Sequence, residues 1–232
     1  MDYRRFFANL ISADTVMLEG AEFRHCVQVT RHKVGFDFIA ICGDGNDYLC
    51  KITEINKGDL YATITSKTTN LCEPKCRVVL FQAVCKELDF IAQKAVELGV
   101  TEIQPFFSHN TNVTTFKRDR FEKIILDASK QCCRGVLPTI KEPVDFATAV
   151  TMSADCENRI ICYEKCTADS FCTITQNNLA LYIGSEGGFT TEEIALAVEK
   201  GLTVTTLGKR ILRAETASIV ALTKCMSGLG EM

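Results

Sequence analysis

The sequence predicts an α/β protein in which a small β-barrel, residues 1–70, precedes a parallel-sheet domain, residues 75–232. Up to about Lys67, short β-rich runs are separated by tight turns, which is typical of a small barrel. After Lys75, apolar strand-like runs alternate with amphipathic helical runs, as in a parallel sheet covered by helices. Residues 68–75 lack periodicity and contain Pro74, so we expect the linker there.

The barrel region contains a series of short strands. Residues 36–41 (FDFIAI) are β-rich and end at the turn sequence of residues 43–47 (GDGND). Further strands are expected at residues 48–52 and 60–65, joined by the turn at residues 57–59.

The second region opens with the continuous apolar run of residues 77–84, which predicts a strand covered on both faces. A helix follows at residues 88–96 and ends at Gly99; its expected buried face is Leu88, Ile91, Ala92, Ala95 and Val96. Thr190 and Glu193 form a capping-box pattern that opens a later helix, which Gly201 closes. The remaining expected elements are strands at 100–106, 159–163, 179–183 and 203–207 and helices at 118–133 and 214–226.

Composition excludes several classes of protein. The net charge is −3, so nucleic-acid binding would depend on a local basic patch. None of the 13 cysteines lies in a C-x-x-C pair, so we expect no metal site. With no apolar signal segment and no run long enough to cross a bilayer, we expect a reduced cytoplasmic protein without a membrane partner.

A glycine-rich turn, Gly184-Ser185-Glu186-Gly187-Gly188, follows the strand expected at 179–183. Carboxyl ends of strands are where α/β sheets bind ligands, and glycine lets bare backbone approach a ligand closely. The spacing is neither G-x-G-x-x-G nor a P-loop, which argues against dinucleotides and ATP. A tight turn without a ligand is the alternative interpretation.

The loop of residues 207–216 (LGKRILRAET) is the second candidate site. Ile211 and Leu212 stand between Arg210 and Arg213, so an apolar pair is placed to hold a flat ring while the arginines reach phosphate or carboxylate. The alternative is a structural pairing of Arg213 with Glu215 at a helix start.

Together these segments resemble the SPOUT superfamily of RNA methyltransferases, and within it the RsmE family, which methylates uridine N3 in 16S ribosomal RNA with S-adenosylmethionine. The resemblance rests on I-G-S-E-G-G at 183–188 and L-G-K-R-I-L-R-A-E-T-A at 207–217, and extends to Q-K-A-V-E-L-G-V at 93–100 with Pro105 and to A-S-K-Q-C-C-R at 128–134. Near the start, Arg5-Phe6-Phe7, His25, Arg31 and Gly35 resemble a PUA-like RNA-binding domain. Ser185, Lys130 and Cys133 depart from the family's usual Pro, Glu and Gly.

The resemblance implies a SPOUT-type trefoil-knotted domain, a homodimer and bound S-adenosylmethionine. Arg213 would stabilise the uridine anion, oriented by Glu215. By the same resemblance, the cofactor pocket would be lined by Tyr163, Glu164, Gly184, Glu186, Gly187, Leu207, Gly208, Ile211 and Leu212.

The expected partner is ribosomal RNA or the small ribosomal subunit. The basic residues expected to contact RNA phosphates are Arg4, Arg5, Arg24, Arg31, Lys86 and Arg134. Two alternatives stay open: a methyltransferase of another RNA position or base, and a non-catalytic RNA-binding protein of the same fold.

Overall fold

The computed structural model describes residues 3–168, 170–175 and 178–232, which form two compact units. The first consists of residues 1–73 and 129–137, and the second of residues 74–128 and 138–232. Each is described by itself.

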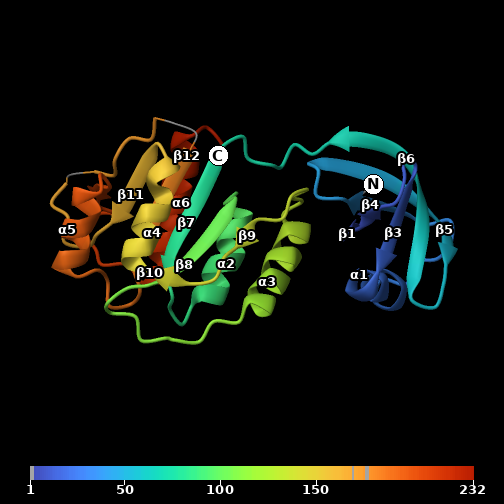
Figure 1. Ribbon diagram of the computed structural model, residues 1–232. Coiled ribbons are helices and arrows are strands. Elements are labelled where there is room, and N and C mark those ends of the chain that lie inside the picture. The colour runs from blue at the N-terminus through green and yellow to red at the C-terminus, as the bar shows by residue number, and fades with distance from the viewer. Residues whose placement is uncertain (1–2, 169, 176–177) are drawn as a thin grey trace. The chain divides into compact units, whose positions relative to one another are not determined.

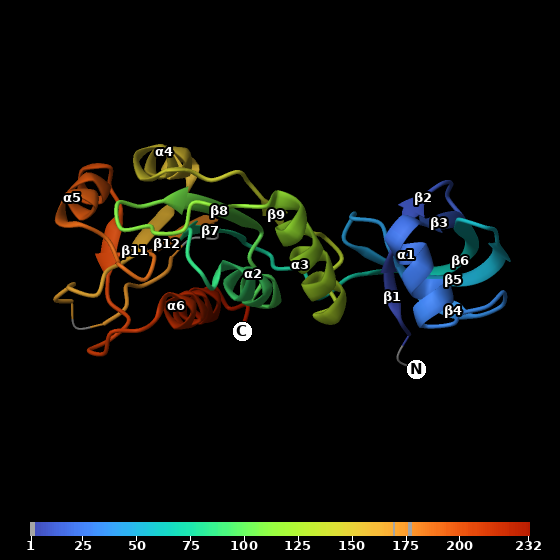
Figure 2. The ribbon, with the colours of Figure 1, turned by 90° about the horizontal axis from the view of Figure 1, so that it is seen from below.

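The first unit is built on a six-stranded sheet in the order β1-β4-β5-β6-β3-β2 (Figure 1). β1 pairs with β4 in parallel and the other neighbours are antiparallel. Figure 2 shows the strands curling around α1, and their inward side chains form one apolar cluster that includes Phe6, Phe38 and Leu60. The strands are β1 (Arg5–Phe7), β2 (Asn9–Leu10), β3 (Thr15–Glu19), β4 (Asp37–Ile41), β5 (Asn46–Ile55) and β6 (Asp59–Thr69).

The expectation of strands alone in this region is wrong for residues 20–29. The chain there forms α1 (Gly20–Arg24), which continues into a π-helix (His25–Val29). A five-residue helix is too short to show a helical period, so the pattern gave no signal for it. β6 also extends to Thr69, into the segment expected to be a linker.

The second unit is a parallel sheet in the order β10-β8-β7-β12-β11-β13, with β9 beside β8. In Figure 2 the sheet lies between α4 and α5 on one face and α2 and α6 on the other. The strands are β7 (Arg77–Ala83), β8 (Glu102–Phe107), β9 (Thr139–Ile140), β10 (Val144–Asp145), β11 (Asn158–Cys162), β12 (Asn178–Ile183) and β13 (Thr203–Thr205). The helices are α2 (Leu88–Glu97), α3 (Arg118–Gln131), α4 (Phe146–Met152), α5 (Thr191–Glu199) and α6 (Ala214–Gly228).

Most predicted elements of this unit are confirmed, including the buried face of α2 and the capping box of α5. Two boundaries were predicted too far along the chain. β13 ends at Thr205 rather than at residue 207, and α3 ends at Gln131 because Cys133 has a positive φ of 65°. No described helix has the length and apolar character needed to cross a membrane.

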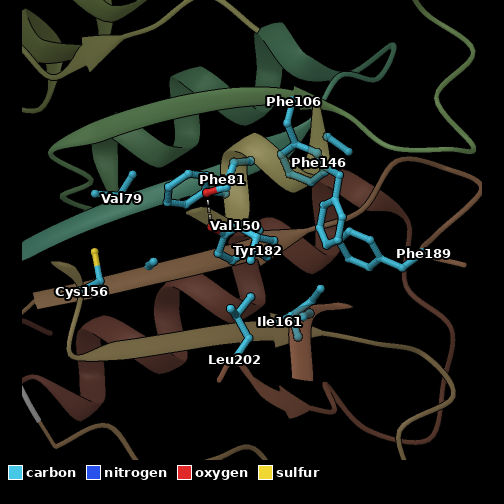
Figure 3. Close-up of a cluster of buried hydrophobic side chains, with 14 residues drawn as sticks. Val79, Phe81, Phe106, Phe146, Val150, Cys156, Ile161, Tyr182, Phe189 and Leu202 are labelled. Atoms are coloured by element: carbon cyan, nitrogen blue, oxygen red, sulfur yellow. Dashed lines mark hydrogen bonds between the residues drawn. The ribbon is translucent and has the colours of Figure 1, made fainter. Parts of the chain in front are cut away.

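An aromatic core fixes the sheet beneath the α4–α5 face. Figure 3 shows Phe81, Phe106, Phe146, Tyr182 and Phe189 packed together. The rings of Phe81 and Tyr182 stack with their centroids 4.4 Å apart, and the Tyr182 hydroxyl donates to the Ala149 carbonyl at 2.7 Å. This packing joins β7 and β12 to α4, so the ends of the two strands are held on a rigid base.

Candidate functional site

A pocket of about 650 Å³ opens at the carboxyl edge of the parallel sheet. It is formed where β7, β11, β12 and β13 end, from the segments that follow these strands. Open parallel sheets bind small ligands at this edge. Its lining includes every residue predicted for the cofactor: Tyr163, Glu164, Gly184, Glu186, Gly187, Leu207, Gly208, Ile211 and Leu212.

The glycines of the turn after β12 are required by close packing. A Cβ atom on Gly187 would lie 2.6 Å from the Asn110 Cβ, too close to be tolerated without movement. Gly188 has a φ of +62°, and a Cβ there would lie 3.2 Å from the Glu164 Oε2. Side chains at either position would displace the walls of the pocket.

Hydrogen bonds hold this turn on two sides. The Asn110 Nδ2 donates to the Gly187 carbonyl at 2.9 Å, and the Ser185 Oγ donates to the Asn110 carbonyl at 3.2 Å. On the side of β7, the Lys86 backbone N–H donates to the Glu186 Oε1 at 3.1 Å. Ser185, a departure from the family pattern, therefore takes part in fixing the turn. Sequence reasoning missed Asn110, because nothing local marks a contact 77 residues away.

The loop between β13 and α6 forms the opposite wall. The Gly208 N–H donates to the Thr206 Oγ1 at 3.1 Å, and Gly208 has a φ of +112° with open space where a side chain would project. The backbone at Gly208 is therefore open toward the pocket space. The Ile211 side chain is 83% exposed.

Arg213 stands at the N-cap of α6, and its carbonyl accepts from the Ala217 N–H at 2.8 Å. Its side chain is exposed and belongs to the pocket lining, as does Glu215 in the first turn. Among the described residues, no ion pair joins Arg213 to Glu215. Within the part of the chain that the structure describes, the guanidinium therefore stands at the pocket without an ion pair to Glu215.

Two cysteines, Cys162 in the pocket lining and Cys85 just before the lining residue Lys86, are poor nucleophiles. Burial, with the nearby carboxylates of Glu186 and Glu215 adding to it, raises the pKa of the Cys85 thiol to about 12. Burial also raises the pKa of the Cys162 thiol well above its ordinary value. Because the thiolate is the reactive form, the site does not favour covalent catalysis by cysteine.

The structure places the predicted RNA-binding residues in two classes. Arg4, Arg24, Arg31 and Lys86 are exposed. The side chains of Arg5 and Arg134 have structural partners instead and do not present their charge freely to solvent.

Arg5 donates to the Asp47 Oδ2 at 2.8 Å with a side chain only 11% exposed. Arg134 is 3% exposed and contacts the Glu73 Oε2 at 3.1 Å. Contact of either guanidinium with a phosphate would require an internal ion pair to open.

Lys130 and Cys133, the other departures from the family pattern, have local structural explanations. The Lys130 Nζ lies 2.8 Å from the Glu22 Oε1, and each side chain is 13% exposed. Glu22 also accepts from the Phe7 backbone N–H at 3.1 Å. Cys133 occupies the left-handed backbone region, which explains why glycine suits that position.

Comparisons with known proteins agree with this geometry. A family described as "RNA methyltransferase domain" matches residues 72–226, and one described as "RNA methyltransferase PUA domain" matches residues 18–65. The chain is 33% identical to the ribosomal RNA small subunit methyltransferase E of Mesomycoplasma hyopneumoniae, over 96% of this chain and 98% of that protein. It is 32% identical to the protein of the same name from Synechocystis, over 90% of this chain and 71% of that protein.

Solved structures give the same result. A methyltransferase from Legionella pneumophila with bound S-adenosylmethionine has a TM-score of 0.88 and 27% identity, covering 98% of each chain. The ribosomal RNA small subunit methyltransferase E of Neisseria gonorrhoeae, bound to S-adenosylmethionine, has a TM-score of 0.86 and 28% identity, covering 97% of this chain and 98% of that one.

Proposed function

Because this chain belongs to the family of small-subunit ribosomal RNA methyltransferases E, we propose that it transfers a methyl group from S-adenosylmethionine to N3 of a uridine in 16S ribosomal RNA. The observation that carries the proposal is the pocket itself. One cavity gathers all nine residues expected at the cofactor together with Arg213 and Glu215.

The residues present fit the cofactor. Bare backbone at Gly208 suits a flat adenosine, and Leu207 and Leu212 supply apolar contact. When bound, S-adenosylmethionine supplies a methyl group already activated on a sulfonium. The protein's part is to hold donor and acceptor in line and to exclude competing geometries.

Uridine N3 carries a proton at neutral pH and must release it to solvent for the methyl group to bond there. Loss of this proton places negative charge on the pyrimidine carbonyl oxygens. The exposed guanidinium of Arg213 is the group at the pocket best suited to stabilise that charge. Glu215, two residues further along α6, is proposed to orient Arg213 once RNA is bound.

Arg4, Arg24, Arg31 and Lys86 are proposed to contact RNA phosphates, since their side chains are exposed.

We further propose a cytoplasmic homodimer with a trefoil knot in the parallel-sheet domain. Light scattering tests the dimer, since a particle of the 25.7 kDa chain mass would exclude it. Cell fractionation tests the location, and recovery of the protein outside the cytoplasm would exclude it.

The testing experiment supplies labelled S-adenosylmethionine and small ribosomal subunits, or their RNA, from a strain lacking the endogenous enzyme. Labelled nucleosides are then identified by mass. We expect 3-methyluridine. A different methylated nucleoside would support an enzyme of another RNA position or base. Absence of transfer together with absence of cofactor binding would support a non-catalytic RNA-binding protein.

A further inference from the structure

A fully buried side-chain amide contacts the first residue of the glycine-rich turn. Gln82 precedes the last residue of β7 and is 0% exposed. Its Nε2 donates to the carbonyl of Gly184 at 3.3 Å and to that of Ala83 at 3.2 Å. Its Oε1 accepts from the Ser218 hydroxyl at 2.7 Å. One amide therefore contacts the glycine turn on one side and α6 on the other.

Both contacts of the Gln82 amide are made with segments that carry pocket residues. Gly184 is the first residue of the turn that lines the pocket. Ser218 lies one helical turn after Ala214, whose carbonyl is 2.8 Å from the Ser218 Oγ, and Arg213 caps this same helix. A shift of the amide would move the cofactor turn and the start of α6 relative to each other.

We propose that Gln82 is a positioning residue that aligns the cofactor turn with the Arg213 end of α6. The inference rests on the proposed methyltransferase function. It adds to the site a residue that lies 102 positions before Gly184 and 136 positions before Ser218 in the sequence. Methyl transfer requires the cofactor, held by the turn, and the guanidinium of Arg213 to be correctly placed relative to each other. Small displacements of either group lower the rate, because catalysis depends on the geometry of the reacting groups.

The chemistry of the amide explains why glutamine stands here. It offers an N–H donor to the Gly184 carbonyl and an oxygen acceptor to Ser218 from the same planar group. An ionised carboxylate of the same shape keeps the acceptor but turns the donor into a second acceptor facing a carbonyl. A protonated carboxyl regains a donor, so Gln82→Glu makes the alignment titratable.

The chain offers a matched control in the neighbouring strand. Gln104 of β8 is 1% exposed, and its Nε2 likewise donates to the next residue's carbonyl, Pro105, at 2.8 Å and to a distant carbonyl, Glu142, at 2.9 Å. Neither glutamine belongs to the pocket lining, but Gln82 bonds to the lining residue Gly184, whereas the carbonyls that Gln104 contacts belong to residues outside the lining. Gln104→Glu therefore introduces the same charge at the same depth without touching the turn.

The experiment measures the Kd for S-adenosylmethionine by calorimetry between pH 6 and pH 8.5 for wild type, Gln82→Glu and Gln104→Glu. Because burial favours the neutral acid, we expect Gln82→Glu to bind close to wild type at low pH and to weaken by at least about tenfold as pH rises and the donor is lost. Gln104→Glu is expected to stay within about twofold of wild type throughout. Equal Kd values for wild type and Gln82→Glu at high pH would overturn the inference.

Ser218→Ala provides a second measurement that introduces no charge. It leaves the Gln82 Oε1 without its donor, and we expect kcat for methyl transfer to fall by at least about fivefold while the KM for RNA stays unchanged. A variant with wild-type kcat and wild-type cofactor affinity would contradict the coupling. If wild type itself neither binds the cofactor nor transfers methyl, the proposed function fails and the inference fails with it; if wild type is active and these variants match it, the inference alone fails.

Discussion

Arg213 is the single residue on which the proposed chemistry depends most. It is exposed at the pocket, and no ion pair within the described part of the chain ties it to Glu215. We predict that Arg213→Ala retains cofactor affinity but lowers kcat by about 10²–10³, the effect of removing one preorganised charge-stabilising donor. Calorimetry and single-turnover transfer measure the two quantities separately. Wild-type turnover by the variant would remove Arg213 from the mechanism.

A substitution at Gly187 tests whether close packing against Asn110 determines the conformation of the cofactor turn. An added Cβ would approach the Asn110 Cβ to 2.6 Å, so we predict that Gly187→Ala destabilises the fold by about 1–3 kcal/mol and weakens cofactor binding. Urea unfolding and calorimetry measure these effects. Because Asn110→Gly removes both the opposing Cβ and the hydrogen bond to the Gly187 carbonyl, the matched reference is Asn110→Gly alone. Gly187→Ala should cost less affinity in that background than in wild type, and an equal cost in both backgrounds would show that the clash is not the cause.

Most of the pocket residues could be predicted from the sequence because they lie in two continuous segments, residues 183–188 and 207–217, while Tyr163 and Glu164 come from a third segment after β11. Asn110 and Gln82 could not be predicted, because their roles arise from contacts with Gly187, Gly184 and Ser218 that exist only in the folded sheet. A glutamine within an apolar strand was the only available signal for Gln82, since a buried amide needs partners.

At the scale of elements, the last turn of α3 and the residues that follow it are held within the first unit by polar contacts. Lys130 pairs with Glu22, and the Glu73 Oε1 accepts from the Gly135 and Val136 backbone N–H groups at 2.6 and 2.8 Å. The Asn70 Nδ2 also donates to the Cys133 carbonyl at 2.9 Å. The sequence predicted α3 but not this association, because the partners lie more than 60 residues apart.

We predict that Lys130→Glu destabilises the protein by about 3–5 kcal/mol, because it places a carboxylate against the largely buried Glu22. Chemical unfolding followed by a probe in the first unit measures the loss. As a control, Lys51→Glu disrupts the exposed pair of Lys51 with Asp37 and should cost at most about 1 kcal/mol. Similar losses in the free energy of unfolding for the two variants would show that the Lys130–Glu22 pair stabilises the protein no more than an exposed pair does.

At the scale of the whole molecule, an acidic net charge of −3 coexists with exposed basic residues at Arg4 and Arg24. We predict that RNA affinity falls as salt rises and that Arg4→Gln and Arg24→Gln each reduce the magnitude of the log–log slope by about 0.7–0.9, the value for one lost phosphate contact. Titrations at several salt concentrations measure the slope. The exposed Lys57→Gln in the β5–β6 turn serves as control, and equal slopes for all variants would place the RNA elsewhere.

The general architecture of a barrel followed by a parallel sheet was predictable, because the hydrophobic period changes from strand-like to alternating strand and helix near residue 75. The division of the chain into units was harder to predict. Residues 129–137 join the first unit although they begin within α3, most of which belongs to the second, and only long-range contacts reveal this.

A crystal structure of the protein grown with S-adenosylmethionine tests the central claim most directly. We predict that the cofactor occupies the pocket between the turn at 184–188 and the loop at 207–213, with its adenine against the backbone at Gly208. Density for the cofactor elsewhere on the molecule, or none at saturating concentration, would contradict the account.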